Sequence, residues 1–343
     1  MEPVYVFGLG QTVGRSMVNR TKADAAGRGS SPVVTVLMSV RDVPGRILAQ
    51  AVDSVLAQTF RDFEFLIYDD GGEDPVVFSA LEEYAQRDAR IRLRHQPPRG
   101  LTRTLNIGLA EAQGRYVARH DADDWSEPDR LAKQLDFLER HTNVAVCGSN
   151  AKMHQENGAP LWTTRLPLEP GTIANALWNG NTFVHGATMF RADAARAIGG
   201  YREEFACSQD YDFFWRLCEF GGGANLAAPL YHYRFRKDAV SARRAQEQAC
   251  VHNVTQMLAR ARQTGANVDV RAALEAQRAA FALSLRARLK QADHRMLAGD
   301  YGGAIRAYSS LLSRYPAHPL AWGKWIRWFV FLAAPPARSL CFR

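Results

Sequence analysis

Three carboxylates lie within four residues in the run His120-Asp121-Ala122-Asp123-Asp124-Trp125. Carboxylates this close repel one another, so a fold that keeps them together usually supplies a cation. Hard oxygen ligands favour Mg²⁺ or Mn²⁺, and such ions commonly bind a substrate's phosphates as their remaining ligands. The run therefore indicates a metal–diphosphate site. A solvated acidic turn is the alternative, and the elements around the run decide between the two.

Strands and helices are predicted to alternate on either side of this run. Segments rich in Val, Ile, Leu and Phe are typical of strands buried on both faces, and segments with apolar residues at helical spacing separate them. The expected strands are 33–40, 63–68, 91–95, 115–119 and 144–148, and the expected helices are 44–56, 75–86 and 101–113. This alternation predicts an α/β fold with a mostly parallel, doubly wound sheet. Residues 150–190 are expected to be irregular or antiparallel, with a strand-like piece at 182–191.

Three polar clusters follow the expected strands. They are residues 39–42, the pair Asp69-Asp70, and residues 121–124. Ligands of such sheets bind beyond the carboxyl ends of the strands, at a topological switch point. We therefore expect the three clusters to converge on one crevice, which favours a binding site over a solvated turn.

A further acidic residue, Asp210, falls in the first turn of an expected helix. Ser208 precedes it as the expected N-cap, and Phe214, Leu217 and Cys218 keep helical spacing. A carboxylate at this place faces the positive end of the helix dipole. By itself the pattern is more typical of a favourable helix start.

Residues 33–240 carry a series of segments that, in this order, resemble the family 2 glycosyltransferases, inverting enzymes with the Rossmann-like GT-A fold. The matching segments are 36–40, 54–64, Tyr68-Asp69-Asp70-Gly71, 99–106, 114–124, Pro128-Asp129-Arg130-Leu131, 185–191, Gly199-Gly200-Tyr201-Arg202 and Gln209-Asp210-Tyr211-Asp212. Ordered agreement over many segments is more specific than a single motif.

The resemblance implies a nucleotide-diphospho-sugar donor, a glycan or lipid-linked acceptor, and Mg²⁺ or Mn²⁺ as cofactor. Matched by position, Asp123 is the main metal ligand of the D-x-D motif, and Asp121 assists with the metal or the ribose. Asp124 is a further candidate. Asp210 matches the base that deprotonates the acceptor hydroxyl, and Asp212 is the second candidate for that role.

Other donor-side roles follow from the same match. Asp70 corresponds to a contact with the nucleotide base, and Ser39 and Arg41 lie on the loop that flanks it. Arg103 is a candidate for the diphosphate, although an outward-facing helical Arg is an equal alternative. His185 corresponds to the acceptor side, with a structural His as the alternative.

Two positions depart from the family pattern. Gln209 stands where Glu often precedes the base, and the proton acceptor itself is retained. In Tyr233-Arg234-Phe235-Arg236, the last residue replaces a His that often contacts metal or phosphate. Arg cannot bind a metal, but its guanidinium can neutralise a diphosphate. We therefore predict that Arg236 supports the leaving group.

Charge is distributed unevenly along the 343 residues. Residues 241–343 carry 16 Lys and Arg against 5 Asp and Glu, whereas the whole chain has a net charge of +8. This basic third indicates an anionic surface as partner, and no nucleic acid is expected. The five cysteines lack metal or disulfide spacing, which favours a reducing cytosol. Residues 1–31 are interpreted as a flexible leader, and no segment is apolar enough to span a membrane.

The organisation predicted from these features is a catalytic domain at 32–240 and a basic helical extension at 241–343. Residues 294–318 resemble one tetratricopeptide-type hairpin, which must pack on the catalytic domain or on a partner. In the aromatic segment 322–332, helical spacing places Trp322, Trp325, Phe329 and Leu332 on one face. That face either completes the core or contacts a membrane surface at the cytosolic side of the inner membrane.

The expected activity is sugar transfer in cell-surface polysaccharide synthesis. One alternative, a sugar-phosphate nucleotidyltransferase, would need a Gly-rich basic loop after the first strand, and residues 41–46 hold one Gly and no Lys. The other alternative is a non-catalytic scaffold that binds partners through its C-terminal helices. The intact Asp121, Asp123 and Asp210 disfavour it.

Overall fold

The computed structural model describes residues 31–236, 244–280, 285–316 and 318–333. Within these residues, nine strands form one sheet in the order β3-β2-β1-β4-β8-β6-β9-β5, and β7 pairs with β6. The strands are β1 (Val34–Val40), β2 (Phe63–Asp70), β3 (Ile91–Gln96), β4 (Tyr116–Asp121), β5 (Trp125–Ser126), β6 (Val146–His154), β7 (Pro160–Thr163), β8 (Met189–Arg191) and β9 (Gly223–Arg234). The predicted leader lies almost entirely outside the described residues.

The first four strands are parallel neighbours, as the alternating pattern predicts. Val34 of β1 pairs in register with Phe63 of β2 and with Tyr116 of β4, so all three strands end at the same edge. At that edge Ser39 is opposite Asp121, and Val40 is opposite Asp69. The predicted convergence of the polar clusters follows from this register.

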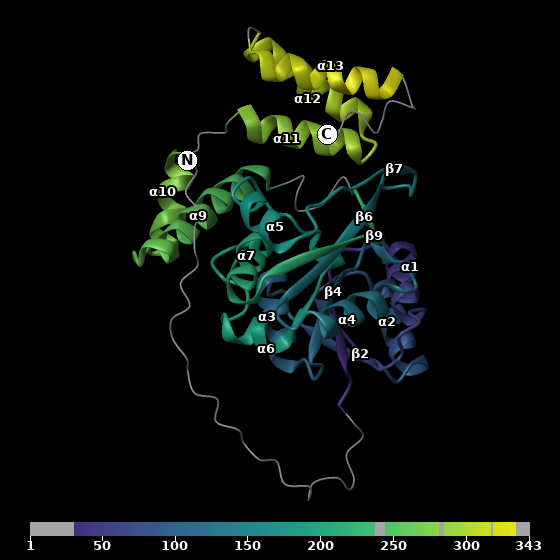
Figure 1. Cartoon of the computed structure of the whole chain (residues 1–343). Coiled ribbons are helices and arrows are strands. Elements are labelled where there is room, and N and C mark those ends of the chain that lie inside the picture. Colours follow the sequence, from purple (N-terminus) through teal and green to yellow (C-terminus); the bar gives the residue numbers. More distant parts are fainter. Residues whose placement is uncertain (1–30, 237–243, 281–284, 317, 334–343) are drawn as a thin grey trace, which may run out of the picture. The chain divides into compact units, whose positions relative to one another are not determined.

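Helices cover both faces of the sheet, since each buried strand must hide its side chains on two sides. Val36 and Met38 pack in one core cluster, whereas Leu37 between them packs in the other. Figure 1 shows α1, α2 and α4 on one side of the sheet and α3, α6 and α7 on the other. The helices of this part are α1 (Gly45–Leu56), α2 (Pro75–Arg87), α3 (Leu101–Glu111), α4 (Arg130–Arg140), α5 (Pro170–Ala176), α6 (Ala192–Ala197) and α7 (Gln209–Gly221).

The segment 182–191 differs from the continuous strand-like piece that the sequence indicates. A 3₁₀ turn, η1 (His185–Ala187), interrupts it, and only β8 joins the sheet. β8 lies antiparallel between β4 and β6. The turn forms where Gly186 packs tightly against Tyr231 of β9, a contact that the local sequence does not encode.

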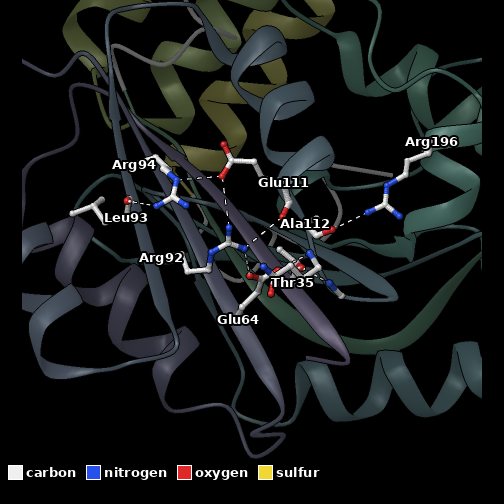
Figure 2. A network of polar contacts seen from close by, with 10 residues as sticks. Thr35, Glu64, Arg92, Leu93, Arg94, Glu111, Ala112 and Arg196 are labelled. Atoms are coloured by element: carbon white, nitrogen blue, oxygen red, sulfur yellow. Dashed lines mark hydrogen bonds and ion pairs between the residues drawn. The ribbon is translucent and has the colours of Figure 1, made fainter. Parts of the chain in front are cut away.

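The amino ends of the strands are held by a polar network around Glu64, which is 5% exposed (Figure 2). Its carboxylate accepts from the Thr35 hydroxyl at 2.6 Å and from the backbone N–H of Gln113 at 2.7 Å. Arg92 of β3 forms an ion pair with the same carboxylate. One buried acid therefore joins β1, β2 and β3 to the end of α3, at the edge of the sheet opposite the convergent polar clusters.

The described residues after β9 are mostly helical. These helices are α9 (Ala245–Thr264), α10 (Val270–Ala280), α11 (Leu285–Leu297), α12 (Tyr301–Arg314) and α13 (Pro319–Ala333). Leu289 and Met296 of α11 and Trp328 of α13 share a core cluster with Tyr231 and Phe235 from the end of the sheet. None of the described helices has the length and apolar character needed to cross a bilayer.

Candidate functional site

A cavity of about 320 Å³ opens where β1 and β2 end. Its walls come from the β1–α1 loop, the end of β2, the first turn of α2 and the residues after β9. Among its lining residues are Arg41, Asp42, Asp69, Asp74 and Arg236. The sequence assigns both Arg41 and Arg236 to the donor side, and in the structure both line this cavity.

Two adjacent carboxylates at the end of β2 have different partners. Asp70 is 1% exposed, and it accepts backbone hydrogen bonds from Arg99 at 2.8 Å and from Gly100 at 2.9 Å. Asp69 lines the cavity and pairs with His95 Nδ1 at 3.0 Å. Asp70 therefore holds the loop before α3, and within the predicted pair Asp69-Asp70 it is Asp69 that lines the cavity. Because β2 is buried on both faces, no polar alternation indicated which of the two faces the cavity.

Asp121 ends β4 in a closely defined position. Its Oδ1 accepts from Arg119 Nη2 at 2.5 Å, and its backbone N–H donates to the Tyr231 hydroxyl at 3.0 Å. A Cβ added to Gly186 would lie 2.7 Å from Asp121 Oδ2 and would clash with the Tyr231 hydroxyl. The absence of a side chain at Gly186 leaves the room that this carboxylate occupies.

The next two acids of the motif differ in their surroundings. Asp123 Oδ2 lies 3.6 Å from Nη1 of Arg236, a residue of the cavity wall. Asp124 is 1% exposed and accepts from the backbone N–H of Arg234 at 2.7 Å. Asp123 is therefore connected with the cavity, whereas Asp124 anchors the end of β9.

The predicted repulsion between these acids is present in their electrostatics. Burial raises the pKa of Asp123 to about 6, and the charge of Asp121 adds to the rise while Arg236 opposes it. Burial also raises the pKa of Asp124 well above its usual value, with Asp123 and Asp121 adding to the effect. For Asp121, burial raises the pKa, but the charge and hydrogen bond of Arg119 together with the neighbouring His185 and His120 lower it below its usual value. A cation bound here would stabilise the ionised pair Asp121 and Asp123.

Asp210 lies in the first turn of α7. Its Oδ2 accepts from Asn181 Nδ2 at 2.7 Å. Burial raises the pKa of Asp210 to about 6, which the backbone N–H groups of the helix start oppose and the charge of Asp121 reinforces. The charge of Asp121 thus reaches Asp210. Ser208 precedes the helix as predicted, but it adopts a left-handed conformation (φ 52°) and its side chain makes no cap hydrogen bond.

His185 and Tyr201 form a buried pair on which the charges of these acids act. His185 Nε2 is 3.0 Å from the Tyr201 hydroxyl. Burial, aided by the charge of Arg119, lowers the pKa of His185 to about 3, so the imidazole is neutral. Burial raises the pKa of Tyr201, and the charges of Asp210 and Asp121 contribute. The sequence indicated His185, but it gave no separate signal for Tyr201.

Asp212, the second candidate for the base, is fully buried. Its carboxylate pairs with Arg216 at 2.8 Å and with Arg202 at 3.2 Å. Arg216 also donates to the backbone carbonyls of Ile198 and Gly200, each at 2.7 Å. Asp212 therefore holds α7 to the end of α6, where an acceptor hydroxyl cannot reach it.

Arg103 and Ser39 are the two remaining residues that the sequence assigns to the donor side. Arg103 is on α3 with 57% of its side chain exposed, and it pairs with Glu203 at 3.7 Å. Ser39 is near the end of β1, in register with Asp121. The structure places Ser39 beside the acidic motif, and Arg103 projects outward as the alternative interpretation had it.

The fit of a divalent metal depends on the two motif acids. Within the described part of the chain, no cluster of three or more His, Cys, Asp or Glu side chains is arranged to hold a metal ion. Asp121 and Asp123 supply two hard oxygen donors that repel each other. This donor set fits Mg²⁺ or Mn²⁺, which are commonly bound by one or two carboxylates together with substrate phosphates.

Comparison with known sequences gives a consistent match. Residues 35–199 match the family model "Glycosyl transferase family 2". The EpsE protein of Bacillus subtilis is 36% identical over 220 residues, which cover 62% of this chain and 77% of EpsE. The O-antigen biosynthesis glycosyltransferase WbnJ of Escherichia coli is 29% identical over 205 residues, which cover 59% of this chain and 79% of WbnJ.

Comparison with solved structures supports the predicted fold. The mannosyltransferase PcManGT of Pyrobaculum calidifontis, solved in complex with GDP-Man and Mn²⁺, aligns with a TM-score of 0.51. The alignment covers 92% of this chain and 89% of PcManGT at 16% sequence identity. The likeness concerns the fold, and it confirms the GT-A prediction.

Proposed function

The chain belongs to glycosyltransferase family 2, and from that membership we propose that it transfers a sugar from a nucleotide-diphospho-sugar to an acceptor hydroxyl with inversion at the anomeric carbon. The acceptor is a glycan or a lipid-linked glycan in cell-surface polysaccharide synthesis. This biological role is supported by the name of WbnJ, an O-antigen biosynthesis enzyme. The family match favours sugar transfer over the nucleotidyltransferase and scaffold alternatives.

We propose that the cavity at the ends of β1 and β2 binds the nucleotide. Arg41 and Asp69 line it, and Arg236 connects it with the acidic motif through Asp123. Arg236 also donates to the Asp42 carbonyl at 3.0 Å, which fixes the guanidinium between cavity and motif. In this position the guanidinium supports the charge of the departing diphosphate. The GDP-Man complex of PcManGT is consistent with a nucleotide-sugar donor.

Asp121 and Asp123 would hold the divalent metal, Mg²⁺ or Mn²⁺. When bound, the metal supplies positive charge to the diphosphate as the glycosidic bond breaks. Arg119 fixes Asp121, and the lack of a side chain at Gly186 leaves room for the Asp121 carboxylate. These residues therefore orient the acidic motif before the donor arrives.

Asp210 is the proposed base. In the reaction, the acceptor oxygen forms a bond to the anomeric carbon, the bond from that carbon to the diphosphate breaks, and the hydroxyl proton passes to Asp210. A carboxylate with a pKa of about 6 is ionised at neutral pH and still has useful basicity. Asn181 holds one of its oxygens, which orients the other. His185 is hydrogen-bonded to Tyr201, on which the charges of both Asp210 and Asp121 act, and this suits the acceptor side of the site.

The observation that supports this proposal is the different surroundings of two acids: Asp121 in the D-x-D motif is fixed by Arg119, and Asp210 at the start of α7 has a raised pKa. The test compares Asp210→Asn with Asp212→Asn across a panel of nucleotide sugars in Mn²⁺. We expect Asp210→Asn to slow transfer by about a thousandfold while leaving the fold intact. Asp212→Asn removes a partner of two arginines, so we expect it to lower the unfolding free energy by about 3 kcal/mol. An Asp210→Asn variant with wild-type transfer would exclude Asp210 as the base.

The C-terminal helices are proposed to hold the enzyme at a membrane surface. Trp322 of α13 is 42% exposed and Ile326 is 53% exposed, and Lys324 and Arg327 lie on the same helix. Exposed aromatic and aliphatic side chains next to cations are typical of helices that lie on anionic lipid. This placement would bring the site to a lipid-linked acceptor.

A further inference from the structure

The loop 177–183, between α5 and η1, carries a side chain that contacts the proposed base. Asn181 Nδ2 donates to Asp210 Oδ2 at 2.7 Å, and the backbone N–H of Phe183 donates to Asn181 Oδ1 at 3.1 Å. A backbone N–H can only donate, so Oδ1 must be the accepting end of the amide and Nδ2 must face the carboxylate. The loop itself therefore determines the orientation of the amide. Within the described part of the chain, Asn181 is the one side chain that donates to Asp210.

Two core elements hold this loop by its backbone. Tyr211 of α7 donates its hydroxyl to the carbonyl of Leu177, and Asn225 of β9 donates to the carbonyl of Thr182 at 3.0 Å. Both donors are buried, with exposed fractions of 2% and 4%. The helix that contributes the base thus also anchors one end of the loop. Carbonyls fixed at both ends restrict the movement of the side chain between them.

Helix α9 holds the same loop at a third point. Gln256 Nε2 donates to the carbonyl of Trp178 at 2.7 Å, and the Trp178 ring meets Trp215 of α7 edge-on, with ring centroids 4.7 Å apart. His252, one turn earlier on α9, stacks on Tyr211 with ring centroids 4.9 Å apart. Figure 1 shows α9 beside α7, and the two helices are in contact. The family match ends at residue 199, so α9 is an element that the family model does not describe.

These contacts have a consequence for proton transfer. A carboxylate accepts a proton efficiently only when one of its lone pairs points at the reacting hydroxyl, and small misplacements of reacting groups are costly. The exposed Asn181 amide binds one oxygen of Asp210 and leaves the other oxygen for the acceptor. We propose that Asn181 is a positioning residue for the base, and that α9 braces the loop that carries it. This inference rests on the proposed function, and it makes α9 necessary for the acceptor step but not for donor binding.

The test uses the full-length protein and two variants of Asn181. Asn181→Ala removes the donor, whereas Asn181→Asp keeps an acceptor for the Phe183 N–H and places a second carboxylate beside the base. Asn157→Ala is the matched control, because Asn157 is also exposed and its side chain accepts from the N–H two residues further on, that of Ala159, at 3.0 Å. Transfer to alkyl hexosides and to a hexose-diphospho-lipid is measured between pH 5 and 8 in Mn²⁺, with the donor that a nucleotide-sugar panel identifies.

A second pair of variants tests the brace. Gln256→Ala removes the hydrogen bond from α9 to the loop. Asn253→Ala is its control on the same helix, because Asn253 donates to Gln277 of α10 at 3.0 Å and not to the loop. We expect Gln256→Ala to lower kcat by about threefold and Asn253→Ala to match wild type.

The Asn181 variants should change the pH profile as well as the rate. The amide N–H stabilises the ionised carboxylate, so its loss raises the pKa of Asp210. We expect the acidic limb of kcat to move to higher pH in Asn181→Ala, and further in Asn181→Asp, because like charges repel. At pH 7, kcat should fall by about tenfold and about a hundredfold, respectively, with KM for the donor unchanged. Asn157→Ala should match wild type in both respects.

The possible outcomes separate this inference from the proposed function. Wild-type kinetics of both Asn181 variants would overturn the inference. A lower kcat with an unmoved acidic limb would also overturn it, because Asn181 would then only support the loop. Wild-type kinetics of Gln256→Ala would exclude α9 as the brace. Full transfer by Asp210→Asn would overturn the proposed base instead, and a wild-type protein that turns over no donor would overturn the proposed function.

Discussion

At the scale of single residues, one residue type takes several roles because the surroundings differ. Asp121 is fixed by Arg119, Asp123 contacts Arg236, and Asp124 is bonded to the backbone of β9. Asp210 keeps a raised pKa with a single side-chain donor, whereas Asp212 is neutralised by two arginines. Environments that separate the behaviour of neighbouring carboxylates are a common basis for assigning catalytic roles.

The raised pKa of Asp210 predicts a pH dependence of transfer. A base must be ionised to accept a proton, so activity is present above the pKa and is lost as the pH falls through about 6. Below that value we expect the rate at saturating donor to fall by about tenfold per pH unit. The measurement is kcat between pH 5 and 8 at saturating metal. A rate that stays constant down to pH 5 would contradict the assignment of this pKa to the base.

Gly186 offers a test of the geometry around the acidic motif. A Cβ at this position would meet Asp121 Oδ2 at 2.7 Å and clash with the Tyr231 hydroxyl. We therefore expect Gly186→Ala to displace the Asp121 carboxylate and to reduce transfer by about a hundredfold, since such displacements misplace reacting groups. Gly171→Ala is the matched control, because a Cβ there meets nothing within 4 Å. Similar kinetics for the two variants would show that the space above Asp121 is not required.

At the scale of elements, the sequence predicts the parallel half of the sheet well. Buried strands of β-branched residues and amphipathic helices alternate from Val34 to Asp121, and local patterns suffice to find them. The turn η1 escaped prediction because its cause is distant: Gly186 packs on Tyr231, which lies on β9. The different positions of Asp69 and Asp70 have a similar origin. Both are buried, and distant partners separate them: Asp69 pairs with His95 of β3, whereas Asp70 accepts hydrogen bonds from the loop before α3.

The network around Glu64 is expected to stabilise the contacts that join β1, β2 and β3 to the end of α3 (Figure 2). Glu64→Ala would leave the Gln113 N–H and the Arg92 charge without their buried acceptor. We expect a loss of about 3 kcal/mol in unfolding free energy, measured by urea denaturation. Glu139→Ala breaks an exposed ion pair with Arg115, so about 0.5 kcal/mol is expected there. Equal midpoints for the two variants would mean that the network does not join the strands.

At the scale of the whole molecule, the C-terminal helices belong to the same compact unit as the sheet, which comprises Pro32–Arg343. The sequence predicted helices here, but the family resemblance gave no guide to where they pack. Their placement depends on non-local contacts: Trp328 is 4% exposed and donates to Asp293 Oδ1 at 2.6 Å. The predicted aromatic face is divided accordingly. Trp325 packs partly against this core, Trp322 is exposed, and the side chains of Phe329 and Leu332 lie outside the described residues.

This division gives the membrane proposal a specific test. If α13 binds lipid through its exposed side chains, the double variant Trp322→Ser and Ile326→Ser should leave the buried Trp328 in place and weaken binding to anionic vesicles by about tenfold. Phe220→Ser removes an exposed aromatic residue of α7 and serves as the control, with unchanged binding. Sedimentation with phosphatidylglycerol vesicles measures the bound fraction, and higher salt should lower it, because the basic residues 241–343 contribute by charge. Equal binding of the double variant and wild type would instead assign α13 to completing the core beside α11, with the exposed Trp322 and Ile326 left as ordinary surface.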